Sequence, residues 1–347
     1  MQPIRTAILS FGMSGQVFHA PFLHQHPGFT LLGSWERSRK LIADRYPGAQ
    51  SFDSLDAVLG EPEVELVVIN TPTYTHYEYT KRVLQAGKHA VVEKAFTTTA
   101  AEAIELQALA TGKNLKLAVF QNRRWDSDFQ TVKSVVAEGR IGEVIEATLA
   151  FPRYDPKLSP KSHKENPGPG AGVLKDLGPH LIDQALLLFG MPEGVFADIA
   201  VTRPQSKVDE YFDVLLRYEG VHVHVKGGYF YREPLPGYVL HGSKGSFLKS
   251  RADVQESQLK AGMTPASEGY GIESEAERGL LHTEVEGRVI RDTIETLPGN
   301  YMEFYEGVYQ SISANTPEPV TAQDGVNVMR ILDAAVASWE ENSLVHL

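Results

Sequence analysis

Residues 8–19 read Ile-Leu-Ser-Phe-Gly-Met-Ser-Gly-Gln-Val-Phe-His, an apolar run that passes through two glycines into a more polar stretch. Gly12 and Gly15 have the spacing of the last two glycines in the G-x-G-x-x-G loop that binds dinucleotides. Ser10 stands where the first glycine belongs. That glycine serves the tight turn rather than the phosphate contact, so we expect Ser10 to be accepted if its φ stays negative. A strand–helix turn without a ligand is the alternative interpretation.

The composition limits the possible functions. A length of 347 residues predicts about two domains. The chain has no cysteine, which excludes disulfides, thiolate nucleophiles and Cys-ligated metals. Its 33 basic and 44 acidic residues argue against a nucleic-acid binder. No run approaches the roughly 20 apolar residues of a membrane span, and the N-terminus lacks a signal-peptide core. We therefore expect a cytoplasmic protein without a membrane or nucleic-acid partner.

The first part of the chain alternates between buried-type strands and amphipathic helices. Apolar runs at 6–11, 29–35, 64–70, 89–93 and 115–121 alternate with helix-like stretches at 15–24, 37–46, 74–86 and 100–111. Unbroken apolar strands separated by helices indicate a parallel sheet covered on both faces. We predict a Rossmann-type dinucleotide-binding domain over residues 1–122.

The pattern changes after residue 122, so the fold class expected is α/β with a second, α+β domain. Longer strands are predicted at 144–151, 194–203, 212–218, 221–230 and 238–241, with strict alternation over 221–225. Helices are predicted at 178–189 and about 322–340, and 253–292 has the composition of a long loop. Residues 123–347 should form an open, mostly antiparallel sheet for substrate binding and oligomerisation. Its last helix is a candidate to pack back on the first domain.

The end of the second predicted strand bears on which cofactor binds. Glu36 lies about 20 residues beyond the loop, where an acid binds the ribose hydroxyl of NAD. Arg37 and Ser38 follow directly and suit the 2′-phosphate of NADP. Both NADP and NAD remain possible. NADP is slightly favoured because Glu36 can turn to solvent while Arg37 stacks on the adenine. Simple exposure of Glu36 and Arg37 is the alternative.

Three side chains are candidates for catalysis. Lys94 ends a buried strand after Glu93, at the sheet edge where parallel sheets bind ligands, and can stabilise a hydroxyl losing its proton. Asp176 and His180 are four residues apart at the start of a helix and can share one side. His180 suits a general base, and Asp176 can orient it or hold a neighbouring hydroxyl. A helix-terminal acid and a packed histidine are the structural alternative.

Four motifs together resemble the Gfo/Idh/MocA family of oxidoreductases, and the resemblance runs through essentially the whole chain. In the family's order and spacing they are Ser10-x-Gly12-x-x-Gly15, Thr71-Pro72-x-x-x-His76, Glu93-Lys94 and Asp176-x-x-x-His180. Residues 14–21, 122–129 and 177–184 are most similar to the branch with the NADP-dependent scyllo-inositol 2-dehydrogenases.

The resemblance implies hydride exchange between a nicotinamide and a secondary alcohol of a cyclitol, polyol or sugar, in a homodimer or homotetramer assembled through the C-terminal sheet. It implies a catalytic trio of Lys94, Asp176 and His180. The cofactor residues expected from the loop and the resemblance are Phe11, Gly12, Ser14, Gly15, Val17, Phe18, Glu36, Arg37, Ser38, Thr71, Pro72, His76, Glu93, Lys94 and Trp125. Arg153 and Tyr154 follow the first long strand, and His163 and Lys164 lie in the loop before Asp176. These positions make all four residues further candidates for substrate binding.

Departures from the family pattern leave alternatives open. The family usually has proline after the lysine, where this chain has Ala95, so we expect either a different local turn or some strain. Lys175 replaces the aromatic residue that close relatives tend to have before the aspartate. A different substrate, such as an aldose, a sugar acid or an imine, is therefore possible. A non-catalytic cofactor- or sugar-sensing regulator is the alternative to an enzyme. No spacing predicts a metal site.

Overall fold

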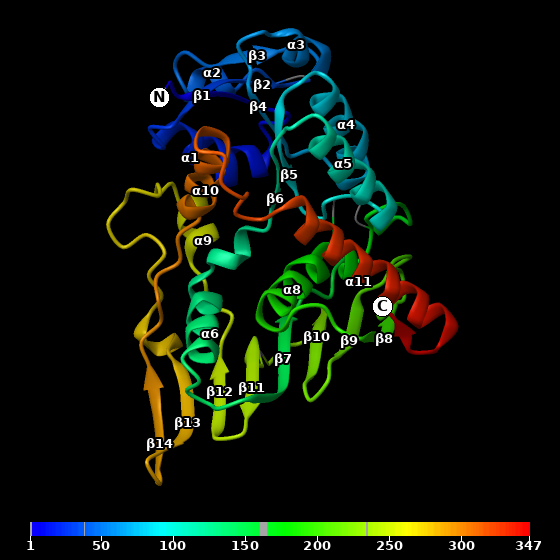
Figure 1. The fold of residues 1–347 in the computed structure, drawn as a ribbon, viewed down its shortest axis with the longest axis vertical. Helices are drawn as coiled ribbons and strands as arrows, with labels where there is room; N and C mark the ends of the chain where they lie inside the picture. The colour runs from blue at the N-terminus through cyan, green and yellow to red at the C-terminus, as the bar shows by residue number, and fades with distance from the viewer. Residues whose placement is uncertain (1, 38, 160–164, 234) are drawn as a thin grey trace. The chain divides into compact units, whose positions relative to one another are not determined.

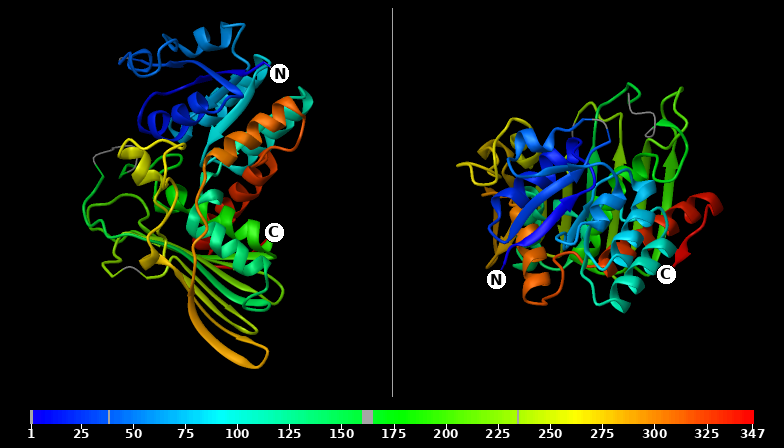
Figure 2. Two further views of the ribbon diagram at one scale, coloured as in Figure 1. Left: turned by 90° about the vertical axis from the view of Figure 1, so that its left-hand side faces the viewer. Right: turned by 90° about the horizontal axis from the view of Figure 1, so that it is seen from above.

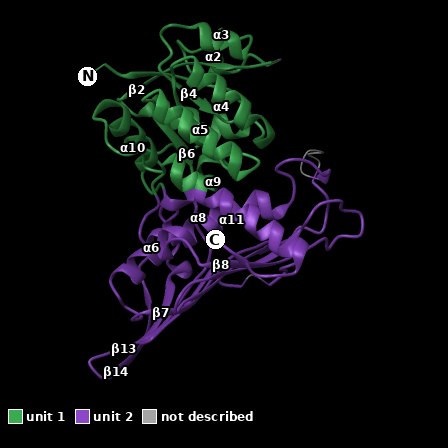
Figure 3. Cartoon of the chain, turned by 45° about the vertical axis from the view of Figure 1, so that its right-hand side comes forward, with its two compact units in different colours: residues 1–122, 255–270, 300–326 green, residues 123–254, 271–299, 327–347 purple. Residues whose placement is uncertain are grey.

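The computed structural model describes residues 2–37, 39–159, 165–233 and 235–347. These residues form two compact units, shown in different colours in Figure 3. Unit 1 comprises residues 1–122, 255–270 and 300–326, and unit 2 comprises residues 123–254, 271–299 and 327–347.

Unit 1 is built on a six-stranded parallel sheet (Figure 1). Its strands are β1 (Ile4–Ile8), β2 (Phe29–Trp35), β3 (Gln50–Phe52), β4 (Leu66–Ile69), β5 (His89–Glu93) and β6 (Leu117–Phe120). They lie in the order β3-β2-β1-β4-β5-β6, and every neighbouring pair is parallel. This order confirms the predicted Rossmann-type sheet. The order reverses between β1 and β4, so a ligand crevice is expected beyond the carboxyl ends of those two strands.

Helices connect the strands of unit 1. They are η1 (Gly15–His19), α1 (Ala20–Gln25), α2 (Ile42–Arg45), α3 (Leu55–Gly60), η2 (Thr73–Thr75), α4 (His76–Gln85) and α5 (Ala100–Gly112). Both β4 and β6 are buried along their whole length, as strands covered on both faces must be. The predicted helix at 37–46 is mostly wrong, because among the described residues of this range only the four of α2 are helical. The sequence prediction missed β3 and α3, which are three and six residues long.

Two later segments complete unit 1 with α9 (Gln255–Lys260) and α10 (Met302–Ser313). The ring of Tyr305 on α10 stacks on Phe22 of α1, with 5.4 Å between centroids and 13° between planes. Tyr309, one turn later, lies against Gly28, where a Cβ would be 2.4 Å from the ring. Aromatic packing therefore fixes α10 on α1 and on the turn before β2.

Unit 2 contains a nine-stranded sheet in the order β14-β13-β12-β11-β7-β10-β9-β8-β15. Its strands are β7 (Val144–Pro152), β8 (Gly194–Ala200), β9 (Tyr211–Arg217), β10 (His222–Gly228), β11 (Tyr238–Gly242), β12 (Gly245–Lys249), β13 (Gly279–Val285), β14 (Arg288–Ile294) and β15 (Val345–His346). Only β7 and β10 run parallel among these pairs, which confirms a mostly antiparallel sheet.

The described helical elements that lie wholly or partly outside unit 1 are η3 (Asn122–Trp125), α6 (Ser127–Ala137), α8 (Val173–Phe189), η4 (Glu275–Glu277) and α11 (Ala322–Glu341). Of these, η3 and α11 begin in unit 1. The prediction of α11 is confirmed, whereas that of α8 is wrong by five residues at its start. Helix α8 begins before the Gly178-Pro179 pair because Asp209 accepts a hydrogen bond from the Leu174 N–H at 2.7 Å. No helix in the described part of the chain is long and apolar enough to span a membrane.

The prediction of a long loop over 253–292 is wrong. This stretch contains α9, η4, β13 and most of β14. In Figure 2, left, β13 and β14 extend as a hairpin beyond the neighbouring strands. Nearly every residue of β14 is exposed, so its sequence has no alternation that would reveal a strand.

The middle strands of unit 2 have one buried and one partly exposed face. In β9, Phe212, Val214 and Leu216 are buried, while the residues between them are half-buried. In β10, Val223 and Val225 are buried, which confirms the alternation predicted over 221–225. Helix α8 contacts β7, β9 and β10 and so covers these strands.

Candidate functional site

The glycine loop of unit 1 follows β1 and leads into η1. The Gly12 N–H donates to Ser10 Oγ at 3.3 Å, and Ser10 has no positive φ, as predicted for a tolerated serine. A Cβ at position 15 would lie 2.1 Å from the Ser10 carbonyl oxygen, so Gly15 allows the helix to pack against the turn. At position 12 a Cβ would meet only Ser10 Oγ, at 3.4 Å. The folded chain therefore leaves room beside Gly12.

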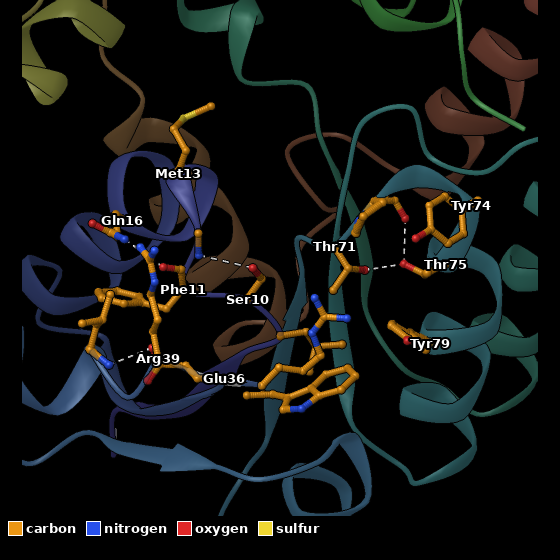
Figure 4. A pocket seen from close by; sticks show the side chains of 16 residues that line it. Ser10, Phe11, Met13, Gln16, Glu36, Arg39, Thr71, Tyr74, Thr75 and Tyr79 are labelled. Atoms are coloured by element: carbon orange, nitrogen blue, oxygen red, sulfur yellow. Dashed lines mark hydrogen bonds between the residues drawn. The ribbon is translucent and has the colours of Figure 1, made fainter. Parts of the chain in front are cut away.

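A pocket of about 510 Å³ opens beside this loop (Figure 4). Ser10, Phe11 and Met13 lie on one side of it, and Thr71, Tyr74, Thr75 and Tyr79 lie on the other. Its lining residues are Leu9, Ser10, Phe11, Gly12, Met13, Gln16, Trp35, Glu36, Arg37, Arg39, Leu41, Thr71, Pro72, Tyr74, Thr75 and Tyr79. The lining residues come mainly from the segments beyond β1, β2 and β4, where parallel sheets bind nucleotides.

Six of the predicted cofactor residues line this pocket, namely Phe11, Gly12, Glu36, Arg37, Thr71 and Pro72. Ser38, another predicted cofactor residue, lies outside the described residues. Sequence reasoning missed Trp35, Arg39, Tyr74 and Tyr79. The sequence could have indicated these residues, because aromatic and basic residues cluster at the end of the second strand and after Thr71-Pro72.

Glu36 does not turn to solvent, and that expectation is wrong. Its carboxylate accepts hydrogen bonds from the backbone N–H groups of Leu41 at 2.9 Å and Ile42 at 3.2 Å. It also accepts one from the Ser51 hydroxyl at 2.5 Å, and the residue is only 6% exposed. Glu36 thus holds the start of α2 against β3. The acid is engaged inside the protein, while Arg37 and Arg39 are exposed beside the pocket.

The pocket has features that fit a dinucleotide. Trp35 Nε1 is buried and makes no hydrogen bond among the described residues. The same holds for Oδ1 of Asn70, which precedes the lining residue Thr71 but does not itself line the pocket. Trp35 packs edge-on against Tyr79 at 5.7 Å, and Tyr74 is 58% exposed. Aromatic walls and unsatisfied polar atoms are what a base with a phosphorylated sugar requires. The room beside Gly12 suits close approach of a pyrophosphate.

The end of β5 lies beyond this pocket in the same unit. Glu93 accepts a hydrogen bond from the Ser14 hydroxyl at 2.7 Å and contacts His19 Nε2 at 3.1 Å. Burial alone would raise the pKa of Glu93, but His19, Ser14 and the charge of Lys94 together hold the pKa below its ordinary value. The Lys94–Ala95 peptide bond is cis although alanine, and not proline, follows the lysine.

His76 joins two segments that carry predicted site residues. Its ring nitrogens lie 2.8 Å from the Ala95 carbonyl oxygen and 2.8 Å from that of Thr71. Burial lowers the pKa of His76, against the opposing effect of these carbonyl groups and of Glu93. His76 therefore positions the pocket wall and the Lys94 segment rather than lining the pocket.

The remaining predicted cofactor residues lie apart from the pocket lining. Val17 is buried within η1, and Phe18 packs edge-on against Tyr301 at 6.3 Å. Trp125 belongs to unit 2.

In unit 2, Asp176 lies in the first turn of α8 and His180 one turn later. Asp209 anchors this turn, and a Cβ at Gly172, whose φ is +95°, would lie 1.7 Å from Asp209 Oδ1. Asp176 is half-buried and His180 is 5% exposed. Helical spacing places both side chains toward one side of α8.

Hydrogen bonds hold the next turn of α8. Asp183 accepts a two-point hydrogen bond from Arg124, at 2.8 and 2.7 Å. Gln184 donates to the Arg123 carbonyl oxygen at 2.9 Å and accepts from Tyr238 at 3.2 Å. The helix segment after His180 is therefore fixed to η3 and to β11.

Two predicted substrate residues lie at the carboxyl end of β7. Arg153 stacks on Phe151 at 4.6 Å, and Tyr154 is stacked by Arg232 at 4.1 Å. Tyr229, which follows β10, is a neighbour that sequence reasoning missed. Burial and the charge of Asp176 raise the pKa of Tyr229, whereas Arg153 and Arg203 lower it.

Strand β10 runs parallel to its neighbour β7, so the two strands end at the same edge of the sheet and Tyr229 lies near Arg153. Sequence reasoning expected a mostly antiparallel sheet and therefore missed Tyr229. The other predicted substrate residues, His163 and Lys164, lie outside the described residues. Within the described residues no group of three histidines or acids is arranged to hold a metal ion.

Comparison with known proteins gives the family. An oxidoreductase family model with an NAD-binding Rossmann fold matches residues 4–121, and the model for that family's C-terminal alpha/beta domain matches residues 133–347. The chain belongs to the Gfo/Idh/MocA family of oxidoreductases and has its NAD(P)-binding domain.

Relatives of known and unknown activity match all or part of the chain. The NADP(+)-dependent scyllo-inositol 2-dehydrogenase IolW of Bacillus subtilis is 35% identical, over 99% of this chain and 96% of IolW. An inositol 2-dehydrogenase of Rhizobium meliloti is 29% identical, over 57% of this chain and 59% of its own length. The solved structure of yvaA from Bacillus subtilis has a TM-score of 0.96 at 35% identity, covering 100% of this chain and 99% of that chain. A structure from Bacteroides fragilis has a TM-score of 0.91 at 44% identity, with full coverage of both chains.

Proposed function

We propose that the protein is an NAD(P)-dependent dehydrogenase that acts on a secondary alcohol of a cyclitol, polyol or sugar, with scyllo-inositol as one candidate. The observation that carries the proposal is the Asp176–His180 pair on an anchored helix, in a chain that also has Lys94 at the end of β5. The similarity to a scyllo-inositol 2-dehydrogenase over nearly the whole chain supports the substrate class. In this proposal residues 1–122 bind the cofactor, and residues 123–347 bind the substrate and form the oligomer.

Each proposed catalytic residue has a role that follows from its chemistry. A nicotinamide cofactor held by the residues of the unit 1 pocket would supply the hydride acceptor for the alcohol carbon, and the hydride donor in the reverse reaction. His180 takes the hydroxyl proton, since imidazole titrates near neutral pH. Lys94 donates a hydrogen bond to the same oxygen and stabilises its negative charge. Asp176 accepts a hydrogen bond from a neighbouring hydroxyl of the substrate, and Arg153 and Tyr154 bind its further hydroxyls.

We propose NADP as the preferred cofactor. Glu36, the acid at the position that favours NAD, is engaged by three donors inside the protein. Arg37 and Arg39 line the pocket, and neither guanidinium group has an ion pair among the described residues. A 2′-phosphate carries about two negative charges and forms strong hydrogen bonds with guanidinium groups.

We also propose that the partly exposed face of the unit 2 sheet pairs with a second copy of the chain. Leu215 of β9, Val239 of β11 and Leu248 of β12 lie on this face and are half-buried in the single chain. This open face also carries the ion-paired Asp213 and Lys226, and its partly exposed leucine and valine side chains are of the kind found at subunit interfaces. A homodimer or homotetramer is the assembly expected.

Substitution of the trio tests the proposed activity. Lys94→Met and His180→Asn should each lower kcat by about a hundredfold or more, since each removes a proton-transfer or charge-stabilising group. The cofactor dissociation constant, measured by fluorescence of the reduced nicotinamide, should stay within about twofold, a change below about 0.5 kcal/mol. Unchanged turnover in either variant would overturn the assignment.

A further inference from the structure

A buried chain of polar groups in unit 1 runs from α10 to the end of β5. The Tyr305 hydroxyl lies 2.6 Å from His19 Nδ1, and His19 Nε2 lies 3.1 Å from Glu93 Oε1. The His19 and Tyr305 side chains are fully buried, and the Glu93 side chain is 15% exposed. His19 is the last residue of the stretch that contains the glycine loop, yet neither His19 nor Tyr305 lines the cofactor pocket.

The carboxylate of Glu93 connects two parts of the candidate site. Its Oε1 accepts a hydrogen bond from the Ser14 hydroxyl at 2.7 Å, at the start of η1. Its Oε2 accepts one from the backbone N–H of Lys94 at 3.2 Å. The placement of this one carboxylate therefore affects both the glycine loop and the backbone that carries Lys94.

Tyr305, at the α10 end of this chain of polar groups, is held rigidly. The Tyr305 ring stacks on Phe22 and packs at 6.1 Å from Phe120, which also lies 4.6 Å from His19. The Tyr305 hydroxyl additionally donates to the Phe18 carbonyl oxygen at 3.0 Å. Side chains whose own positions are locked by packing can hold a neighbouring group in one geometry.

A carboxylate buried beside aromatic rings is costly unless it is fully hydrogen-bonded, and an apolar side chain would fill the same volume without that cost. In this unit His19, Ser14 and the Lys94 N–H supply the compensation. We propose that Tyr305 and His19 are positioning residues, which act through Glu93 to fix the Lys94 segment and the start of η1 relative to each other. The effect on turnover rests on the proposed dehydrogenase function, whereas the effect on Lys94 itself does not.

Steady-state kinetics of Tyr305→Phe and His19→Leu provide the first test. Each should lower kcat by about tenfold, the lower end of the range for loss of an outer hydrogen-bonding partner. KM for the substrate should stay within about twofold, because neither side chain is among the proposed substrate residues. His19→Gln should recover part of the lost turnover, since its amide can still donate to Glu93.

Tyr309→Phe is the matched control. Tyr309 lies one turn from Tyr305 on α10 and packs against His26 and Phe29 at 5.4 and 6.0 Å. Its hydroxyl makes no hydrogen bond among the described residues, so this variant should retain the wild-type kcat. Circular dichroism and thermal unfolding establish that each variant is folded. If Tyr305→Phe does not fold, the kcat of His19→Gln is compared with that of His19→Leu instead.

A second readout does not require turnover. Reductive ¹³C-methylation labels the lysine amines, and the signal lost in Lys94→Met assigns Lys94 in the NMR spectrum. The Lys94 signal should move in Tyr305→Phe and stay in place in Tyr309→Phe. If wild-type protein oxidises no alcohol, the proposed function fails, and the Lys94 signal alone decides the positioning role. An unmoved Lys94 signal, or a kcat equal to wild type in an active enzyme, overturns the proposal.

Discussion

A Cβ at position 15 would lie 2.1 Å from the carbonyl oxygen of Ser10, so the start of η1 requires glycine there. The contact is with the backbone of residue 10, so it does not depend on whether that residue is serine or glycine.

The two glycines of the loop should therefore behave differently when changed to alanine. Gly15→Ala should destabilise the protein by about 3 kcal/mol, because backbone atoms must move. Gly12→Ala should leave the unfolding free energy within about 0.5 kcal/mol, since its Cβ meets only Ser10 Oγ. It should nevertheless weaken NADP binding about tenfold or more. Urea unfolding and calorimetric titration measure both quantities. Gly60→Ala, with open space around its Cβ, is the control.

Arg37 should set the preference for NADP. Arg37→Ala should raise the KM for NADP by roughly tenfold to a hundredfold, corresponding to loss of a charged hydrogen bond worth about 1.5–3 kcal/mol. The KM for NAD should remain within about twofold. Lys40→Ala is the control, because Lys40 pairs with Asp53 at 2.7 Å and does not line the pocket. Equal changes for both cofactors would show that Arg37 does not read the 2′-phosphate.

Glu36 should matter for stability rather than for cofactor choice. Glu36→Ala leaves the N–H groups of Leu41 and Ile42 without their acceptor and should cost about 2 kcal/mol of unfolding free energy. Ser51→Ala, which removes a single donor, should cost about 1 kcal/mol. Chemical denaturation gives both values. The idea fails if Glu36→Ala has wild-type stability and a changed ratio of NADP to NAD affinity.

Asp209 should show an inverted pH dependence. Burial raises its pKa, against the hydrogen bond from Leu174. The folded protein therefore holds this proton more tightly than the unfolded chain, and stability is lost as pH rises from below the ordinary pKa of 3.8 through the raised pKa of the folded state. Asp209→Asn keeps an acceptor without the charge, so it should be at least as stable as wild type at pH 7.

The advantage of Asp209→Asn should disappear near pH 3.5. Asp209→Ala, without the helix cap, should lose about 1 kcal/mol at pH 7. Urea unfolding at the two pH values makes the comparison. If Asp209→Asn lost more unfolding free energy, relative to wild type, at pH 7 than near pH 3.5, the pKa of Asp209 would not be raised in the folded protein.

The open sheet face should control self-association. Leu215→Glu places a charge on that face and should shift the protein from dimer or tetramer to monomer, as seen by sedimentation velocity. Ile104→Glu, at an exposed apolar position on α5, should leave the assembly unchanged. If Leu215→Glu has the same oligomeric state as wild type, the interface does not lie on this sheet face.

Much of unit 1 could be predicted from the sequence because its parallel strands are buried on both faces and form plain apolar runs. The Phe29–Trp35 and His89–Glu93 strands have the bounds that were expected. β14 could not be found in this way, since an edge strand exposed on both faces has no alternation. The start of α8 was misplaced because Asp209, its capping residue, lies 35 positions from Leu174 in the sequence.

The candidate site was only partly predictable for the same physical reason. Motif spacing identified the glycine loop and Thr71-Pro72, since these contacts are local in the sequence. The engagement of Glu36 by Ser51, and of Glu93 by His19, depends on packing between distant segments. No local pattern distinguishes an acid that binds a ribose from one that holds a helix.

A spectrophotometric screen of cyclitols, polyols and sugars, with NADP and NAD in parallel, tests whether the protein is a dehydrogenase. We predict formation of the reduced nicotinamide with at least one cyclitol, polyol or sugar, faster with NADP, and its loss in Lys94→Met and His180→Asn. No reduced nicotinamide with any substrate, in protein that binds NADP tightly, would contradict the claim and favour a cofactor- or sugar-sensing regulator.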